Sequence, residues 1–224
     1  MSRTVIAIDG PAGSGKSTTA KLVAKRLGFI YLDTGAMYRA ITLKCLRTKK
    51  DANDQEEVTR VAKDSAIEFA LKDDINHIYL DGEDVTEAIR QPQIDKGVSV
   101  LARHPKLREV LVGQQRKLGQ KDNLVAEGRD TTTVVFPNAI KIYLAADLNE
   151  RAKRRLLELE SKGIRSSLEE QTEEISRRDK LDSTRQASPL LVDKEATIVD
   201  TTNLTIEQQV ERVIEIYKNQ IKTK

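Results

Sequence analysis

The sequence lacks the features that mark secreted, membrane and nucleic-acid-binding proteins. Cysteine occurs once in 224 residues, as Cys45, so no intrachain disulfide can form and a reducing compartment is expected. No signal peptide and no apolar run long enough to cross a membrane is present, so a cytoplasmic protein is expected. The formal net charge is only +3, without the one-sided basic stripe of a nucleic-acid-binding protein. These absences leave a globular protein without a membrane or nucleic-acid partner.

Further absences bear on organisation. Linkers rich in serine and glycine are missing, which indicates one protein with insertions rather than domains on tethers. The sequence has no aromatic-rich apolar face of the kind that would indicate an obligate dimer, so we expect a monomer. His77 and His104 have no spacing typical of metal ligands, and Cys45, in an apolar helical stretch, is expected to pack in the core. The chain is long enough for one sizeable domain and short for two.

The most specific feature present is a glycine-rich octapeptide. It reads Gly10-Pro11-Ala12-Gly13-Ser14-Gly15-Lys16-Ser17 and fits the pattern G-x-x-x-x-G-K-[ST]. A β-branched apolar run precedes it and a helical pattern follows it, and such a strand, turn and helix N-terminus gather backbone N–H groups around one point. The sequence therefore predicts a nucleoside triphosphate site. There, Lys16 reaches the β- and γ-phosphates and Ser17 ligates Mg²⁺.

Apolar runs alternate with helical patterns along the chain, which is typical of a parallel sheet built from βα units. The expected core strands are residues 5–9, 29–32, 124–126, 140–144 and 197–199. A last helix is expected after Thr205, a good N-cap with Gln208 three residues on. We therefore expect an α/β fold with a P-loop core, in which helices flank a five-stranded parallel sheet.

Two stretches depart from this alternation. Some ninety residues separate the second and third core strands, and part of this stretch, about residues 66–86, predicts a small antiparallel meander with turns at 72–74 and Asp81-Gly82. Pro92 and Pro105 each open a further helix. The second stretch, 147–185, is rich in Arg, Lys and Glu and predicts two charged helices interrupted by Gly163.

Polar motifs follow the core strands at their carboxyl ends, where open α/β sheets bind ligands. Residues 32–39 follow the second strand, with Thr34 as the expected helix N-cap, and residues 126–130 end the third strand. The Asn-Lys-x-Asp element that GTPases use to read guanine is absent. These motifs favour a kinase.

Together the motifs resemble those of bacterial-type cytidylate kinases, from Ile6 to the final helix. The resemblance rests on residues 8–11, 32–39, 81–85, 128–130 with 133–137, and Arg178-Asp179 with Asp182 and Arg185. It implies a core (1–33, 120–147 and 186–224), an NMP-binding arm (34–119), a lid (about 148–185) and the sheet order 2-3-1-4-5. Where the family usually has a glycine after Gly-Arg-Asp-x, this chain has Thr132, which bears on the backbone near the base pocket.

The resemblance also implies the site residues. It assigns ATP to Gly10, Pro11, Ala12, Gly13, Ser14, Gly15, Lys16, Ser17 and Thr18, and to one or two of Arg151, Arg154 and Arg155, with Arg151 and Arg155 preferred. It assigns the acceptor phosphate to Arg39, Arg129 and Arg185, the acceptor ribose to Arg178 and Asp182, the cytosine ring to Ser99, Arg108 and Asp130, and the rest of the acceptor pocket to Thr34 and Tyr38. Lys16, Arg39, Arg129 and Arg185 are the expected catalytic residues. Mg²⁺ is expected on Ser17 directly and on Asp33 and Glu127 through water.

Spacing gives one further expectation for this set. Arg178, Asp182 and Arg185 are spaced i, i+4, i+7, which places them on one helical face. For the first two of these residues, an ordinary surface salt bridge is the alternative interpretation.

The chemistry of phosphoryl transfer favours the same activity. Two polyanions must be brought together, and arginine forks hold phosphate oxygens better than lysines do. We expect a phosphotransferase that uses ATP, Mg²⁺ and CMP or dCMP. The alternatives are a P-loop kinase for another nucleotide or a small acid, which the extended arm and base-binding set disfavour, and a switch without turnover, which the arginine-rich lid disfavours.

Overall fold

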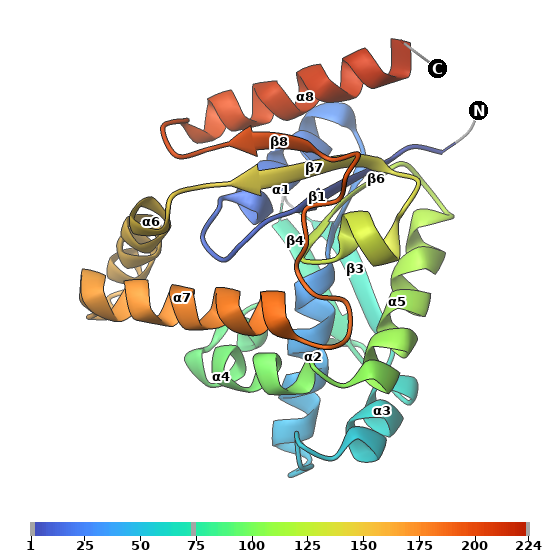
Figure 1. Cartoon of the computed structure of the whole chain (residues 1–224). Coiled ribbons are helices and arrows are strands. Elements are labelled where there is room, and N and C mark those ends of the chain that lie inside the picture. The colour runs from blue at the N-terminus through green and yellow to red at the C-terminus, as the bar shows by residue number, and fades with distance from the viewer. Residues whose placement is uncertain (1–2, 73–74, 223–224) are drawn as a thin grey trace. The chain divides into compact units, whose positions relative to one another are not determined.

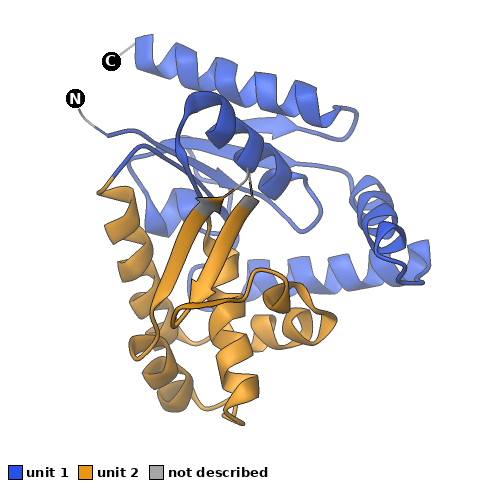
Figure 2. Cartoon of the chain, turned by 180° about the vertical axis from the view of Figure 1, so that it is seen from behind, with its two compact units in different colours: residues 1–31, 122–224 blue, residues 32–121 orange. Residues whose placement is uncertain are grey.

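The computed structural model describes residues 3–72 and 75–222 (Figure 1). The chain forms two compact units (Figure 2): unit 1 comprises residues 1–31 and 122–224, and unit 2 comprises residues 32–121. Unit 2 is thus one continuous stretch of chain, and unit 1 is made of the two stretches that flank it.

The larger sheet carries the expected parallel strands, all of them in unit 1 except the second half of β2, which belongs to unit 2. They are β1 (Val5–Asp9), β2 (Ile30–Asp33), β6 (Leu124–Gly128), β7 (Ile140–Ala145) and β8 (Thr197–Asp200), in the order β2-β6-β1-β7-β8. Counted within this sheet alone, the order is 2-3-1-4-5; counted over the chain, the numbers differ because three strands of another sheet intervene. All five expected strands are found, with ends that differ from the expected ones by at most two residues.

Two helices cover one face of this sheet. In α1 (Lys16–Leu27) and α8 (Ile206–Lys222), apolar side chains pack against buried side chains of β1, β6, β7 and β8 to form the core of unit 1. The predicted capping of α8 is confirmed, because Thr205 N donates to Gln208 Oε1 over 2.9 Å and Gln208 N donates to Thr205 Oγ1 over 3.3 Å. This packing fixes the phosphate loop between β1 and α1.

A helical hairpin follows β7 (Figure 1). The helices α6 (Leu148–Ser161) and α7 (Leu168–Thr184) confirm the two charged helices, and Gly163 separates them with a φ of 71°. Ser167 and Glu170 form a capping box at the start of α7. However, α7 ends at Thr184, and Arg185 has extended backbone with ψ 143°. The expected continuous helical face was therefore wrong for Arg185, because the chain turns back and Leu190 N donates to Asp182 O over 2.8 Å.

Unit 2 combines helices with a small sheet. Its helices are α2 (Thr34–Arg47), α3 (Gln55–Lys63), the 3₁₀ turn η1 (Ala88–Arg90), α4 (Pro92–Leu101) and α5 (Pro105–Gly119). The predicted meander is confirmed as β3 (Ile67–Lys72), β4 (Ile75–Leu80) and β5 (Glu83–Asp84), antiparallel in that order. Of its first predicted turn, residues 73 and 74 lie outside the described residues; in the second, Asp81 and Gly82 both have positive φ.

One local prediction in unit 2 was wrong, and the others are confirmed. Pro92 and Pro105 do open α4 and α5. Thr34, however, is the first residue of α2 rather than its N-cap, because the carboxylate of Asp33 accepts from Ala36 N over 2.9 Å and takes the capping position. Cys45 is 1 % exposed and packs in the core as predicted.

A π-helical turn, η2 (Thr131–Val135), follows β6 in unit 1. Its i→i+5 bonds run from Val135 N to Asp130 O over 3.0 Å and from Phe136 N to Thr131 O over 2.8 Å. Such single turns are frequent at functional sites. In the part of the chain that the structure describes, no helix is sufficiently long and apolar to cross a membrane.

Candidate active site

The phosphate loop requires its glycines for conformation and for space. Gly13 and Gly15 have φ values of 75° and 86°, which side chains rarely adopt. A Cβ on Gly10 would lie 2.4 Å from the backbone oxygen of Leu144. The loop ends where α1 begins at Lys16, so the helix N-terminus and its unpaired N–H groups face the loop. This is the geometry of an anion site.

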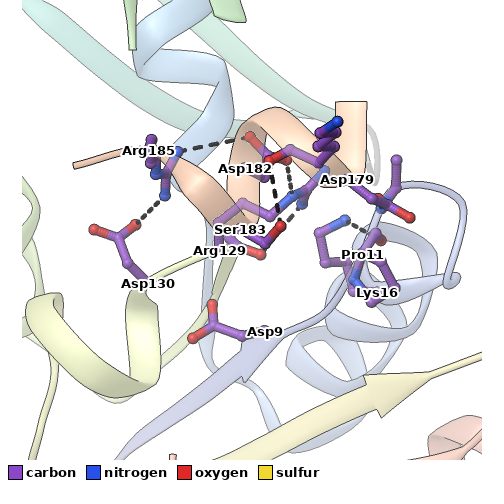
Figure 3. A network of polar contacts seen from close by, with 12 residues as sticks. Asp9, Pro11, Lys16, Arg129, Asp130, Asp179, Asp182, Ser183 and Arg185 are labelled. Atoms are coloured by element: carbon purple, nitrogen blue, oxygen red, sulfur yellow. Dashed lines mark hydrogen bonds and ion pairs between the residues drawn. The ribbon is translucent and has the colours of Figure 1, made fainter. Parts of the chain in front are cut away.

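Lys16 is buried beside this loop (Figure 3), and its Nζ donates to Pro11 O over 3.3 Å. Burial, together with the positive charges of Arg129 and Arg178, lowers the pKa of Lys16 to about 7, and Glu127 and Asp182 oppose this shift only in part. A bound polyphosphate would add negative charge beside the Lys16 ammonium group and so favour its protonated form. The surroundings of Lys16 thus favour a strongly anionic ligand.

Ser17 and Glu127 come together at the carboxyl end of the sheet. The Ser17 hydroxyl donates to Glu127 Oε1 over 2.8 Å, and the Tyr31 hydroxyl donates to the same oxygen over 3.5 Å. A hydroxyl and a carboxylate are ligands that Mg²⁺ accepts, directly or through water. Within residues 3–72 and 75–222, no group of three or more His, Cys, Asp or Glu could hold a metal ion by itself.

Asp33, the other expected magnesium residue, is engaged within unit 2. Its Oδ1 caps α2, and its Oδ2 accepts from Arg90 Nη2 over 2.7 Å. Burial alone would raise the pKa of Asp33, but Arg90 and Arg39 lower it. These contacts give Asp33 a structural role within unit 2, and its expected contact with Mg²⁺ through water stays a prediction, as does that of Glu127 beside Ser17.

Arginines and carboxylates converge next to Lys16 (Figure 3). Arg129 Nε donates to Asp182 Oδ2 over 2.7 Å, while Arg185 lies 3.7 Å from Asp182 Oδ1 and 3.9 Å from Asp130 Oδ1. Burial alone would raise the pKa of Asp182, but Arg129, Arg178 and Arg185 together lower it. The structure thus brings these site residues of unit 1 together, and the surface salt bridge proposed as the alternative for Asp182 does not describe it.

The three lid arginines have different partners. Arg151 is buried and donates to Ala12 O over 3.0 Å and to Asp179, whose other carboxylate oxygen accepts from Ala12 N over 3.1 Å. Arg154 donates to the backbone of Thr201 over 2.5 Å. Arg155 pairs with Glu158 over 2.8 Å. Arg151 thus contacts the phosphate loop through Ala12.

The remaining expected acceptor residues belong to unit 2. Arg39 pairs with Asp95 over 2.5 Å, and both side chains are largely buried. Arg108 is buried on α5, where it donates to Ala102 O over 3.0 Å and its guanidinium lies 5.1 Å from the ring centroid of Tyr38. Ser99 lies half-buried on α4, and Thr34 is buried at the start of α2. Their assignment to one ligand with residues of unit 1 is a proposal, taken up below.

The sequence analysis missed two acidic residues of this site. Asp179 stands in a quoted motif but received no role, although it bonds the phosphate loop and Arg151. Asp9 also stands in a quoted motif, at the end of a strand, and received no role, yet its buried carboxylate accepts hydrogen bonds from Thr131 and Thr132. The two histidines have partners of their own: His77 pairs with Asp84, and His104 contacts Ala52 O.

The fold and site define the class of the protein. A glycine-rich loop joins the central strand of a parallel sheet to a helix N-terminus, and a buried lysine with converging arginines lies beside it. These features define a P-loop kinase.

Comparisons with known proteins identify the family. A model of the family described as cytidylate kinase matches residues 6–219. Curated cytidylate kinases from Caldanaerobacter subterraneus subsp. tengcongensis and Bacillus cereus are 52% and 46% identical, over 97% and 96% of this chain and 96% of each relative. The chain belongs to the cytidylate kinase family, whose members are ATP-dependent transferases. A gluconokinase structure from Sinorhizobium meliloti, at 11% identity and a TM-score of 0.52 over 99% of this chain and 97% of that one, shares the fold.

Proposed function

We propose that the protein transfers the γ-phosphoryl group of ATP to CMP and dCMP, which gives ADP and CDP or dCDP. The observation that carries this proposal is the largely buried cluster of Arg129, Asp182 and Arg185 beside the buried Lys16. A transferring phosphoryl group develops charge that arginine forks stabilise, and their carboxylate partners hold these forks in a fixed orientation. Membership of the cytidylate kinase family supports the same substrates.

On the donor side, the backbone N–H groups of the phosphate loop and the N-terminus of α1 hold the ATP phosphates. Lys16 reaches the β- and γ-phosphates, and the bound negative charge favours its protonated form. Arg151 and Arg155 of the lid cover the nucleotide. These residues neutralise the donor so that a second anion can approach.

The pair of Ser17 and Glu127 fits Mg²⁺, because a hydroxyl and a carboxylate oxygen lie 2.8 Å apart at the end of the loop. Ser17 would hold the ion directly and Glu127 through water. The ion supplies charge neutralisation between the β- and γ-phosphates when it is bound.

On the acceptor side, we assign the phosphate of CMP to Arg39, Arg129 and Arg185, and the ribose to Arg178 and Asp182. We assign the base to three residues, Ser99, Arg108 and Asp130. Thr34 and Tyr38 complete the pocket. An ionised Asp130 can only accept hydrogen bonds and suits the N4 amino group of cytosine, whereas Arg108 can only donate and suits N3 or O2.

A coupled assay with ATP and each nucleoside monophosphate tests this proposal. Uracil presents O4 to a carboxylate and N3–H to an arginine, so buried polar groups would stay unpaired with UMP. We expect kcat/KM for CMP to exceed that for UMP by at least roughly 10². Asp130→Asn should narrow this ratio because an amide can donate to O4, and Asp122→Asn, at an exposed acid of the same unit, should leave it unchanged.

Each other outcome has a definite meaning. Equal use of CMP and UMP would overturn the base assignment and indicate a broader pyrimidine kinase. Turnover only with a different acceptor would indicate a P-loop kinase of another specificity, and nucleotide binding without turnover would indicate a switch. Our proposal also includes a cytoplasmic, monomeric protein, which size-exclusion chromatography and cell fractionation test directly.

A further inference from the structure

Asp9 is a buried carboxylate with an unusual set of partners. It is 0% exposed at the end of β1, and its Oδ1 accepts from Thr131 N over 2.9 Å and Thr131 Oγ1 over 2.6 Å. Its Oδ2 accepts from Thr132 N over 2.8 Å and Thr132 Oγ1 over 2.6 Å. All four donors are neutral. Burial raises the pKa of Asp9, and these hydrogen bonds, which favour the ionised carboxylate, oppose that shift.

The four donors belong to the N-terminal end of η2. A helical turn leaves its first N–H groups without partners in the turn, and an anion placed there satisfies them and complements the dipole. Asp9 therefore caps η2 from a different strand, 122 residues away in the sequence. Such a long-range cap fixes where the turn lies in the fold as well as how it begins.

The same residue is tied to the other end of this segment. In the parallel pairing of β1 with β6, Asp9 stands opposite Gly128, the last residue of β6. Arg129 and Asp130 are the only residues between this strand contact and the hydrogen bonds at Thr131. On its other side, Asp9 is followed directly by Gly10 of the phosphate loop. One residue thus borders the donor loop and holds both ends of the segment that carries Arg129 and Asp130.

We propose that Asp9 is a positioning residue for phosphoryl transfer, which fixes Arg129 and Asp130 in place relative to the phosphate loop. Thr132, at the position where the family usually has a glycine, adds the fourth hydrogen bond through its hydroxyl. The inference rests on the proposed function, because it assigns a role in that reaction. It adds a residue that touches neither substrate and acts through Arg129.

The first test is Asp9→Asn, which keeps the shape of the side chain. An asparagine replaces one of the two acceptor oxygens by an NH₂ group. The backbone N–H of Thr131 or Thr132 would then face another donor, and a hydrogen bond would be lost. Because a displacement of about 1 Å can cost as much as 10²-fold in rate, we expect kcat to fall by roughly 10- to 10²-fold with little change in the KM for ATP. Asp147→Asn is the matched control: Asp147 caps α6 through Asn149 N over 2.8 Å, and this change should leave kcat unaltered.

A double-mutant cycle separates positioning from general stability. If Asp9 acts through Arg129, Asp9→Asn should cost much less in an Arg129→Ala background than in the unaltered protein. Equal losses in the two backgrounds, or an unchanged kcat in a folded Asp9→Asn protein, would overturn the proposal. If the unaltered protein phosphorylates no monophosphate, the proposed function fails instead, so the two failures are distinguishable.

Variants at Thr132 keep the proposal testable if Asp9→Asn does not fold. Thr132→Ala removes one hydroxyl and keeps the backbone N–H, and should lower kcat a few-fold. Thr132→Ser should restore it, since the hydroxyl returns. The proposal would also be overturned if Thr132→Ala lowered kcat and Thr132→Ser did not restore it. The same holds if Thr132→Ala lowered kcat equally in the Arg129→Ala background.

Discussion

The surroundings of the phosphate loop in unit 1 and the surface of unit 2 use the same charged residue types in different ways. Around the phosphate loop of unit 1, paired side chains are largely withdrawn from solvent: Arg129 and Asp182 are each 14% exposed. Many pairs of unit 2 face solvent instead, as with Arg47 and Glu83 at 44% and 59%. Exposed pairs contribute little to stability, whereas a buried charge is costly unless it is paired. Burial of a charge therefore separates candidates for chemistry from ordinary surface charges, and unit 2 has such candidates too, in Arg39 and Arg108.

The largest effect should come from the lysine in the phosphate loop. Lys16→Ala should fold and lose at least roughly 10² in kcat, because it removes a charge contact that is strongest in the transition state. Lys21→Ala, at an exposed position of the same helix, is the matched control and should be close to normal. Steady-state kinetics with ATP and CMP measure kcat for both variants and for the unaltered protein. A near-normal kcat for Lys16→Ala would remove the loop from the mechanism and erase the contrast between buried and exposed charges.

Two adjacent arginines of α7 test the contrast within one helix. Arg178 is half-buried and lowers the pKa of Asp182, while Arg177 is exposed. Removal of a hydrogen bond to a charged group costs about 1.5–3 kcal/mol, so Arg178→Ala should lose about 10-fold or more in kcat/KM for CMP. The KM for ATP should change little. Equal losses for Arg177→Ala and Arg178→Ala would contradict the assignment of Arg178 to the ribose.

The stability of the buried cluster should depend on pH. The arginines hold the pKa of Asp182 below its value in the unfolded chain, so this carboxylate stabilises the folded state above the unfolded pKa. That contribution is lost as the pH falls through the lowered pKa. Urea unfolding of the unaltered protein should therefore show a free energy of unfolding that declines in acid, and Asp182→Asn should show a flatter decline. An identical pH dependence in the two proteins would show that Asp182 has no such linkage.

The smallest effect should come from an exposed pair of unit 2. Arg47 and Glu83 form two hydrogen bonds, at 2.7 and 2.9 Å, yet both are largely exposed. A double-mutant cycle on their alanine variants should give a coupling of about 0.2–1 kcal/mol, with kcat unchanged. A coupling several times larger, or a loss of turnover, would mean that exposure does not separate the two kinds of charge.

Local patterns allowed most of the fold to be predicted from the sequence. The strand, phosphate loop and helix depend on neighbouring residues, so their order in the chain was enough. The cap of α2 shows the limit of such patterns, because Asp33 and Thr34 both carry a capping oxygen and only the backbone path decides between them. Arg185 shows the same limit, since helical spacing does not reveal where a helix ends.

The contacts that sequence reasoning missed are long-range. Asp9 meets Thr131 across 122 positions of the chain, and Ala12 meets Asp179 across 167. No periodicity links residues so far apart, and one sequence contains no signal for such a pair beyond an acidic residue at the end of an apolar strand. Resemblance to a family supplied the positions of the arginines but not these supporting contacts.

The interruption of unit 1 by unit 2 has a consequence for synthesis on the ribosome. Strand β1 pairs with β6 on one side and β7 on the other, so both neighbours emerge more than one hundred residues after it. Unit 2 is continuous and can fold as soon as its own residues have emerged. Until β6 follows, β1 is an apolar strand with two unpaired edges and a nascent chain in need of protection from aggregation. The phosphate loop is thus made before both strands that pair with β1, and it reaches its final structure only after they have emerged.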